Sequence, residues 1–112
     1  MATHDPLKYI RDNNETIDWI TSSMYTQMTE DFIEEFQDKV HWANISYYQN
    51  NISEEFIIKF EDKIVWQYIS QRRQLSNQFI LKYIHKLKPT DLLRSQRNLD
   101  KITEEYLKLL IG

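Results

Sequence analysis

The chain has 112 residues, which suits one compact domain with a modest core and is too short for two domains of ordinary size. It contains no cysteine, which excludes disulfide bonds, thiolate zinc sites and cysteine nucleophiles. Its net charge of −3 opposes a polyanion as the main partner. No segment has the roughly 18 apolar residues of a membrane span, and the N-terminus lacks the apolar stretch of a signal peptide, so we expect an intracellular protein.

Helices are favoured over a β-sandwich or barrel, because one glycine and two prolines are too few for many tight turns. The first expected helix covers residues 6–12 and has Pro6 near its first position, where the missing N–H does no harm. Three tryptophans follow with spacings of 23 and 24 residues, namely Trp19, Trp42 and Trp66. Aligning the chain on them reveals a tandem repeat. We therefore predict an all-α fold, a small α-solenoid of stacked helical hairpins with about seven to nine short helices.

The repeat divides the single predicted domain into units. These cover residues 5–18 (partial), 19–41, 42–65, 66–88 and 89–112 (degenerate). Each full unit is expected to contain a short first helix that carries its tryptophan and a second helix that starts after a hydroxyl side chain. The expected N-caps are Thr29, Ser53, Ser76 and Thr103. An apolar residue precedes each cap and another follows five positions later, which is the pattern of a hydrophobic staple: Met28–Ile33, Ile52–Ile57, Leu75–Ile80 and Ile102–Leu107.

Aromatic side chains mark the expected core. The second helices carry apolar residues at spacings i, i+1 and i+4, including Phe56 and Phe79, so each should bury one face. We expect Trp42 and Trp66 to be equivalent and buried between successive units, and Trp19 to take the same structural role. Ser53 and Ser76 are also interpreted as structural, because helix starts need hydroxyl acceptors.

The second full unit resembles the tandem repeat proteins of large DNA viruses and of some phages. The shared pattern is W-x-x-I-S-x-x-Q-x-L-S-x-x-F-I-x-x-F-x-D-K, and this unit has one residue more than the pattern between Gln49 and Ile52. The residues that carry the pattern here are Trp42, Ile45, Ser46, Gln49, Ile52, Ser53, Phe56, Ile57, Phe60, Asp62 and Lys63. The likeness covers roughly residues 17–88, and Arg73 departs from it where the pattern has Gln. The resemblance implies a helical repeat fold and a viral origin, and it implies no enzymatic activity.

No catalytic, metal-binding or cofactor-binding pattern is recognisable. The three histidines, His4, His41 and His85, lack metal-ligand spacing, and the only glycine is the last residue, so there is no phosphate-binding loop. Neighbouring carboxylates lie beside helix caps or on expected solvent faces. We therefore expect a protein that is not an enzyme and that needs no cofactor.

Charge is distributed unevenly along the chain. Residues 1–56 contain eleven acidic and three basic residues, and residues 57–112 contain six acidic and eleven basic residues. The leading hypothesis is a protein–protein interaction module whose acidic half binds a basic protein surface, with these candidate contacts: Glu30, Asp31, Glu34, Glu35 and Asp38. With the viral resemblance, an inhibitor of a host factor such as a CRISPR-type defence effector is one form of this hypothesis.

Two alternatives remain open. The basic half could bind nucleic acid through Arg72, Arg73, Lys82, Lys86, Arg94 and Arg97. The chain could also self-assemble head to tail as a structural repeat, because Leu109, Leu110 and Ile111 lack the polar outer face of a capping unit. The sequence names no partner.

Overall fold

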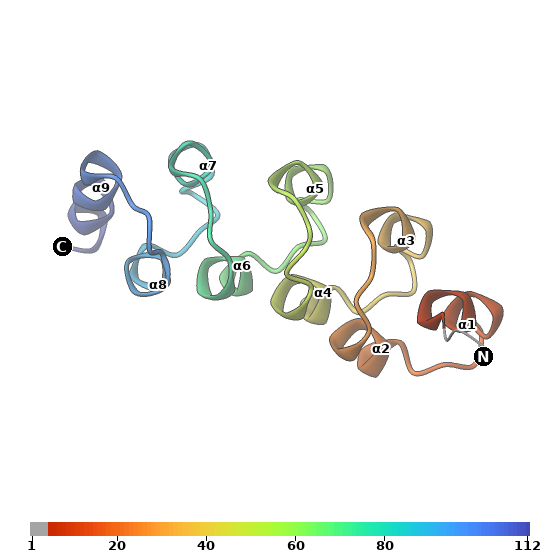
Figure 1. Cartoon of the computed structure of the whole chain (residues 1–112). Helices are drawn as coiled ribbons and strands as arrows, with labels where there is room; N and C mark the ends of the chain where they lie inside the picture. Colours follow the sequence, from red (N-terminus) through yellow and green to blue (C-terminus); the bar gives the residue numbers. More distant parts are fainter. Residues whose placement is uncertain (1–4) are drawn as a thin grey trace. The chain divides into compact units, whose positions relative to one another are not determined.

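The computed structural model describes residues 5–112, and this part of the chain forms nine α-helices and no strand. They are α1 Pro6–Asp12, α2 Trp19–Tyr25, α3 Glu30–Glu35, α4 Trp42–Tyr48, α5 Glu54–Lys59, α6 Trp66–Arg72, α7 Asn77–Lys82, α8 Pro89–Ser95 and α9 Lys101–Ile111 (Figure 1). The predicted all-α fold of short helical hairpins is confirmed, and so is the helix that begins at Pro6. Eight of these helices have only six or seven residues, about two turns each.

The chain divides into two compact units, Met1–Ile52 and Ser53–Gly112. We call them the acidic unit and the basic unit, because the first has nine acidic and three basic residues and the second has eight acidic and eleven basic residues. The division falls between α4 and α5. The prediction of one domain, made of repeat units that begin near residues 19, 42, 66 and 89, stays a prediction.

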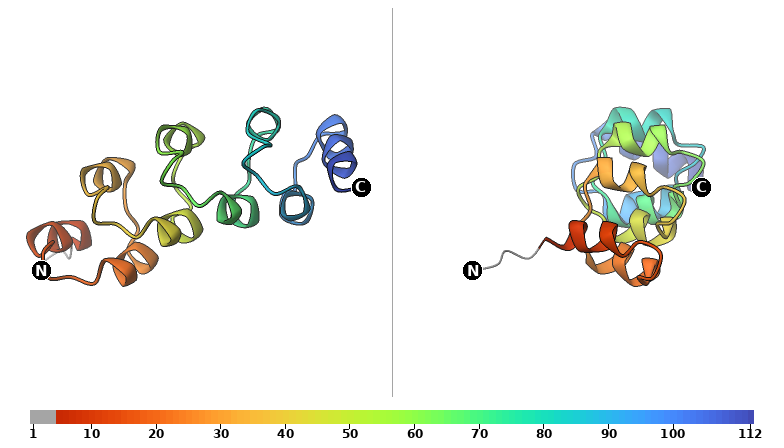
Figure 2. Two further views of the ribbon diagram at one scale, coloured as in Figure 1. Left: turned by 180° about the vertical axis from the view of Figure 1, so that it is seen from behind. Right: turned by 90° about the vertical axis from the view of Figure 1, so that its right-hand side faces the viewer.

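Within each unit, neighbouring hairpins pack so that helices two apart in the chain lie side by side (Figures 1 and 2). In the acidic unit, α2 packs against α4, and an ion pair joins α1 to α3. In the basic unit, α6 packs against α8, while α9 packs against both α7 and α8. A short helix therefore finds its partners in the next repeat, as in other stacked repeat proteins.

Three of the four predicted N-caps are confirmed. The side-chain oxygens of Thr29, Ser53 and Ser76 each accept the N–H three residues ahead, at 3.1 Å in every case. The expected staple residues of these helices are buried: Met28, Ile33, Ile52, Ile57, Leu75 and Ile80.

The fourth predicted cap is wrong. Asp100 caps α9 instead, accepting the N–H of Thr103 at 2.7 Å, and Thr103 lies buried inside the helix. Ile102 is 76% exposed, so it forms no staple with the buried Leu107. Aspartate and threonine both favour the N-cap position. The earlier of the two adds about one turn to α9, which has 11 residues and is the longest helix of the described residues.

The three tryptophans anchor each first helix, but they are half-buried rather than buried as expected. Each indole N–H donates to a backbone carbonyl five residues earlier, on Asn14, Gln37 and Glu61, at 2.9–3.0 Å. The rings lie on aromatic residues of the second helix in the two cases described within one unit: Trp19 on Phe32 and Phe36, and Trp66 on Phe79 and Tyr83. Tryptophan therefore closes its hairpin and also fixes the loop that precedes it.

A buried glutamine joins consecutive repeats of the acidic unit. Gln49, the C-cap residue of α4, is 3% exposed. Its Nε2 donates to the carbonyls of Ser23 and Thr26 at 3.0 and 2.8 Å, and its Oε1 accepts the N–H of Met28 at 2.9 Å. One side chain thus satisfies three backbone groups, one in the last turn of α2 and two in the segment that leads to α3. Gln96 repeats this arrangement in the basic unit, bonding the carbonyl of Arg73 and the N–H of Leu75.

Buried serines form a second bridge between repeats. Ser70 donates to the carbonyl of Trp66 at 3.1 Å and accepts the N–H of Lys88, the residue before α8, at 3.0 Å. Ser23 accepts the N–H of His41, the residue before α4, at the same distance. These hydroxyls therefore tie α2 to the start of α4 and α6 to the start of α8.

No helix among the described residues is both long enough and apolar enough to cross a membrane.

We predict that Gln49→Met destabilises the protein by about 2–4 kcal/mol, because it leaves buried backbone groups without a hydrogen-bond partner. Urea denaturation followed by circular dichroism measures the free energy of unfolding. Gln27→Met is the matched control, because Gln27 is exposed and should change that free energy by less than about 0.5 kcal/mol. Equal stability of the two variants would contradict a structural role for the Gln49 amide.

Candidate protein-binding surface

The predicted acidic contacts gather on and just after α3. Asp31, Glu35 and Asp38 are exposed, whereas Glu30 and Glu34 are half-buried. Glu30 and Asp31 occupy the first turn of the helix, where the helix dipole stabilises negative charge. Four of the five predicted contacts thus lie on α3, Asp38 follows its end, and the five differ in how far they reach solvent.

Glu35 belongs to the internal structure as well as to the surface. Its two carboxylate oxygens accept hydrogen bonds from Nη2 and Nε of Arg11 at 2.9 and 3.3 Å, which joins α3 to α1. The guanidinium also lies over the rings of Phe32 and Phe36, with its central carbon 5.4 and 5.9 Å from the ring centroids. The hydrogen bonds from Arg11 lower the pKa of the Glu35 carboxyl below its usual value. Glu35 therefore forms an ion pair inside the acidic unit.

All three cations of the acidic unit are engaged within it. Lys8 pairs with Asp12 at 2.7 Å, Arg11 with Glu35 at 2.9 Å, and Lys39 with Glu15 at 2.5 Å. The unit nevertheless carries a net charge of −6, because its acidic residues outnumber its basic residues by nine to three. The surrounding field therefore attracts a cationic partner.

The predicted basic contacts do not form one uniform surface. Arg72, Lys82, Arg94 and Arg97 are exposed, whereas Arg73 and Lys86 are half-buried. The ammonium nitrogen of Lys86 lies 5.6 Å from the Trp66 ring centroid, and that of Lys82 lies 5.8 Å from the Tyr83 ring centroid. The two lysines thus cover aromatic rings of their own unit, while the exposed arginines reach solvent. The basic unit has a net charge of +3.

The histidines take structural positions where the structure describes them. His41 caps α4, and its Nδ1 accepts the N–H of Asn44 at 3.3 Å. The ring of His85 stacks on that of Tyr83 with centroids 6.4 Å apart. His4 lies outside the described residues. Over residues 5–112, no group of three or more His, Asp or Glu side chains is arranged to hold a metal ion.

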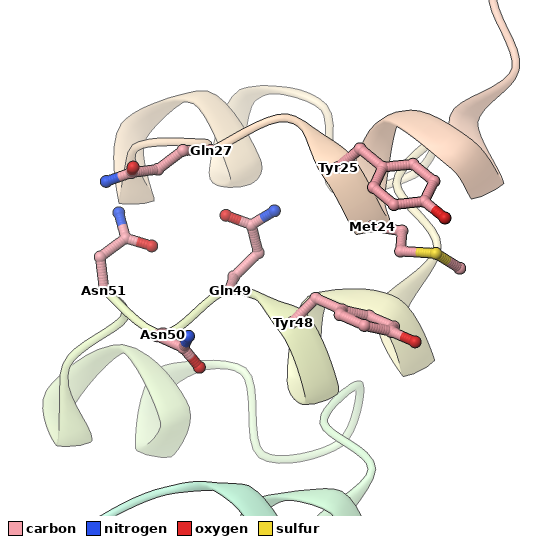
Figure 3. Close-up of a pocket in the computed structure, with 7 residues that line it drawn as sticks. All are labelled: Met24, Tyr25, Gln27, Tyr48, Gln49, Asn50 and Asn51. Atoms are coloured by element: carbon pink, nitrogen blue, oxygen red, sulfur yellow. The ribbon is translucent and has the colours of Figure 1, made fainter.

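A pocket of about 300 Å³ lies in the acidic unit, where the ends of α2 and α4 meet the segments that follow them (Figure 3). It is lined by Met24, Tyr25, Gln27, Tyr48, Gln49, Asn50 and Asn51. Tyr25 and Tyr48 form one side of it with Met24 between them, and the amide side chains form the other side. Every lining residue is neutral.

Sequence reasoning missed this pocket. Tyr25 and Tyr48 are the last residues of α2 and α4, so they occupy the same position in consecutive repeats, 23 residues apart. That recurrence was visible in the alignment. What the alignment did not reveal is that these rings stay exposed, by 79% and 40%, while the glutamine next to Tyr48 is buried.

Comparisons of the chain with protein-family models, with curated proteins and with solved structures gave no match.

We predict that Arg11→Met raises the pKa of Glu35 toward its ordinary value, because the hydrogen bonds that favour the carboxylate are lost. A pKa that is lowered in the folded state adds stability above the unfolded-state pKa, and that stability is lost as the pH falls through the folded-state pKa. The stability difference between parent and Arg11→Met should therefore shrink on acidification.

Carbon-detected NMR titration of the Glu35 carboxyl measures the pKa, and urea denaturation at several pH values measures the stability. Lys8→Met is the control, since Lys8 lies on the same helix and pairs with Asp12. A Glu35 midpoint that Arg11→Met leaves unchanged would contradict the assigned role of the pair.

Proposed function

We propose that the protein is a non-enzymatic interaction module whose acidic unit binds a basic surface of another protein. The observation that supports this proposal is the charge difference between the two compact units, −6 in one and +3 in the other. Charge complementarity steers encounter and selects partners more than it adds affinity, so a folded unit with this excess suits recognition of a cationic protein. Stacked repeats also present extended surfaces, which supports binding rather than catalysis.

The resemblance to viral and phage repeat proteins extends the proposal. A small interaction module of that origin acts inside the host cell, where inhibition of a host factor such as a CRISPR-type defence effector is a suitable role. A basic nucleic-acid channel is the kind of surface that an acidic module would occupy. This part of the proposal rests on the resemblance and on the charge of the acidic unit.

We predict that charge reversal at two exposed carboxylates of the acidic unit, Asp31→Lys with Asp38→Lys, weakens binding to the protein partner. The association rate should fall by about tenfold at low salt, and by less at high salt, because screening removes long-range attraction. Surface plasmon resonance against a basic protein captured from host-cell lysate measures both rates.

Glu105→Lys is the matched control, because Glu105 is an exposed carboxylate of the basic unit. Thermal melts verify that each variant is folded, since reversal in the first turn of α3 also opposes the helix dipole. If Glu105→Lys slows association as much as the double reversal does, the acidic unit is not the binding surface.

Nucleic-acid binding is the second candidate, supported by the exposed Arg72, Arg94 and Arg97 of the basic unit. We predict no shift of single- or double-stranded oligonucleotides at micromolar protein and low salt, because the acidic unit repels a polyanion. A mobility-shift assay at two salt concentrations tests this. A tight shift that weakens by about 0.7–0.9 log units per log unit of salt for each phosphate contact would favour the nucleic-acid role instead. Charge reversal at the three arginines should then abolish the shift.

A further inference from the structure

We infer that the pocket between the ends of α2 and α4 binds an arginine side chain of the protein partner. This inference rests on the proposed function, because it names the residue type that the acidic unit would recognise. Four features of the pocket support it: the open tyrosine rings, the neutral amide lining, the absence of a cation at the two helix ends, and the charge of the unit.

The tyrosine rings are available to a ligand. Tyr25 is 79% exposed, and its side chain makes no hydrogen bond or ring contact with any residue that the structure describes. Tyr48 is 40% exposed and contacts one ring, that of Tyr47, edge-on at 4.7 Å between centroids. Such exposed aromatic rings at a pocket are typical anchors of protein interfaces, where arginine is their frequent partner.

The same protein already uses cations on aromatic faces. Arg11 covers Phe32 and Phe36 in the acidic unit at 5.4 and 5.9 Å from the ring centroids. In the basic unit, Lys86 covers Trp66 at 5.6 Å. A guanidinium over Tyr25 or Tyr48 would repeat this contact with a cation from another molecule.

The ends of α2 and α4 lack the cation that most other helices provide for themselves. A basic residue lies in the last turn of six helices, namely α1, α5, α6, α7, α8 and α9, where it offsets the negative end of the helix dipole. In the last turns of α2 and α4 there is none, and the final residues are Tyr25 and Tyr48. At the same position of the repeat, α6 ends in Arg72. A partner arginine would therefore supply at this pocket the charge that α6 carries in its own sequence.

The lining favours arginine over lysine. No carboxylate lines the pocket, so a compact ammonium would lose its hydration without a counter-ion beside it. A guanidinium is less strongly hydrated, stacks on planar rings, and has five N–H donors for neutral acceptors. The side-chain oxygens of Gln27, Asn50 and Asn51 can accept hydrogen bonds from these N–H groups. The side-chain nitrogen of Asn51 already donates to the carbonyl of Met28 at 2.9 Å. The net charge of −6 on the unit adds long-range attraction.

The test is an NMR titration of the full chain with blocked tripeptides. The first peptide is acetyl-Gly-Arg-Gly-amide. In three further peptides, lysine, phenylalanine or citrulline, the neutral isostere of arginine, replaces the arginine. The arginine peptide should shift the ring resonances of Tyr25 and Tyr48 and the side-chain amide resonance of Asn50, and it should bind at least tenfold more tightly than the citrulline peptide. Tyr25→Ala and Tyr48→Ala should each weaken the binding of the arginine peptide by between about twofold and thirtyfold.

Tyr9→Ala is the matched control, because Tyr9 is a 60% exposed tyrosine of the same unit that does not line the pocket. The titration needs no partner, so it is independent of the charge-reversal experiment: if Asp31→Lys with Asp38→Lys leaves partner binding unchanged, the proposed function fails while the arginine site can still be observed. Equal binding of the arginine and citrulline peptides, tighter binding of the phenylalanine peptide, or an equal effect of Tyr9→Ala would overturn the arginine site.

Discussion

Helices of six or seven residues leave most of their backbone groups without a partner inside the helix, because an α-helix has four unpaired N–H groups at its start and four unpaired carbonyls at its end. This constraint shapes the whole chain. Caps such as Thr29 pair some of these backbone groups within the same repeat. Side chains from the next repeat, such as Gln49 and Gln96, pair others. A hairpin is therefore complete only when its neighbour is folded, which makes the repeats cooperative.

Local features were predictable from the sequence, and contacts between repeats were not. The caps at Thr29, Ser53 and Ser76 could be predicted, because a cap and the N–H that it accepts are three residues apart. The bonds of Gln49 connect backbone groups 21–26 residues away, which no local pattern specifies. The prediction of the α9 cap was wrong for a different reason. Asp100 and Thr103 are both suitable N-cap residues, and periodicity alone does not choose between them.

The candidate binding surface also has features that the sequence could not predict. Counting charges predicted the acidic and basic parts, because net charge depends on composition alone. The count could not reveal that Arg11 holds Glu35, since the two residues are 24 positions apart. The pocket had one signal in the sequence, a tyrosine at residues 25 and 48 of successive repeats, but exposure separates an interface ring from a core ring, and exposure follows from packing.

Several bonds between repeats are neutral, and these do not depend on the surface charge. Amide and hydroxyl side chains such as Gln49 and Ser70 keep their hydrogen bonds across the pH range in which carboxylates titrate and at any ionic strength, whereas exposed ion pairs weaken with salt. The acidic unit nevertheless uses several of its carboxylates in its structure: Asp18 caps α2, and Asp12, Glu15 and Glu35 form ion pairs. Substitution of the exposed Asp31 should report on binding more than substitution of Glu15 or Glu35 does, because the ion pairs of those two residues connect positions 24 residues apart.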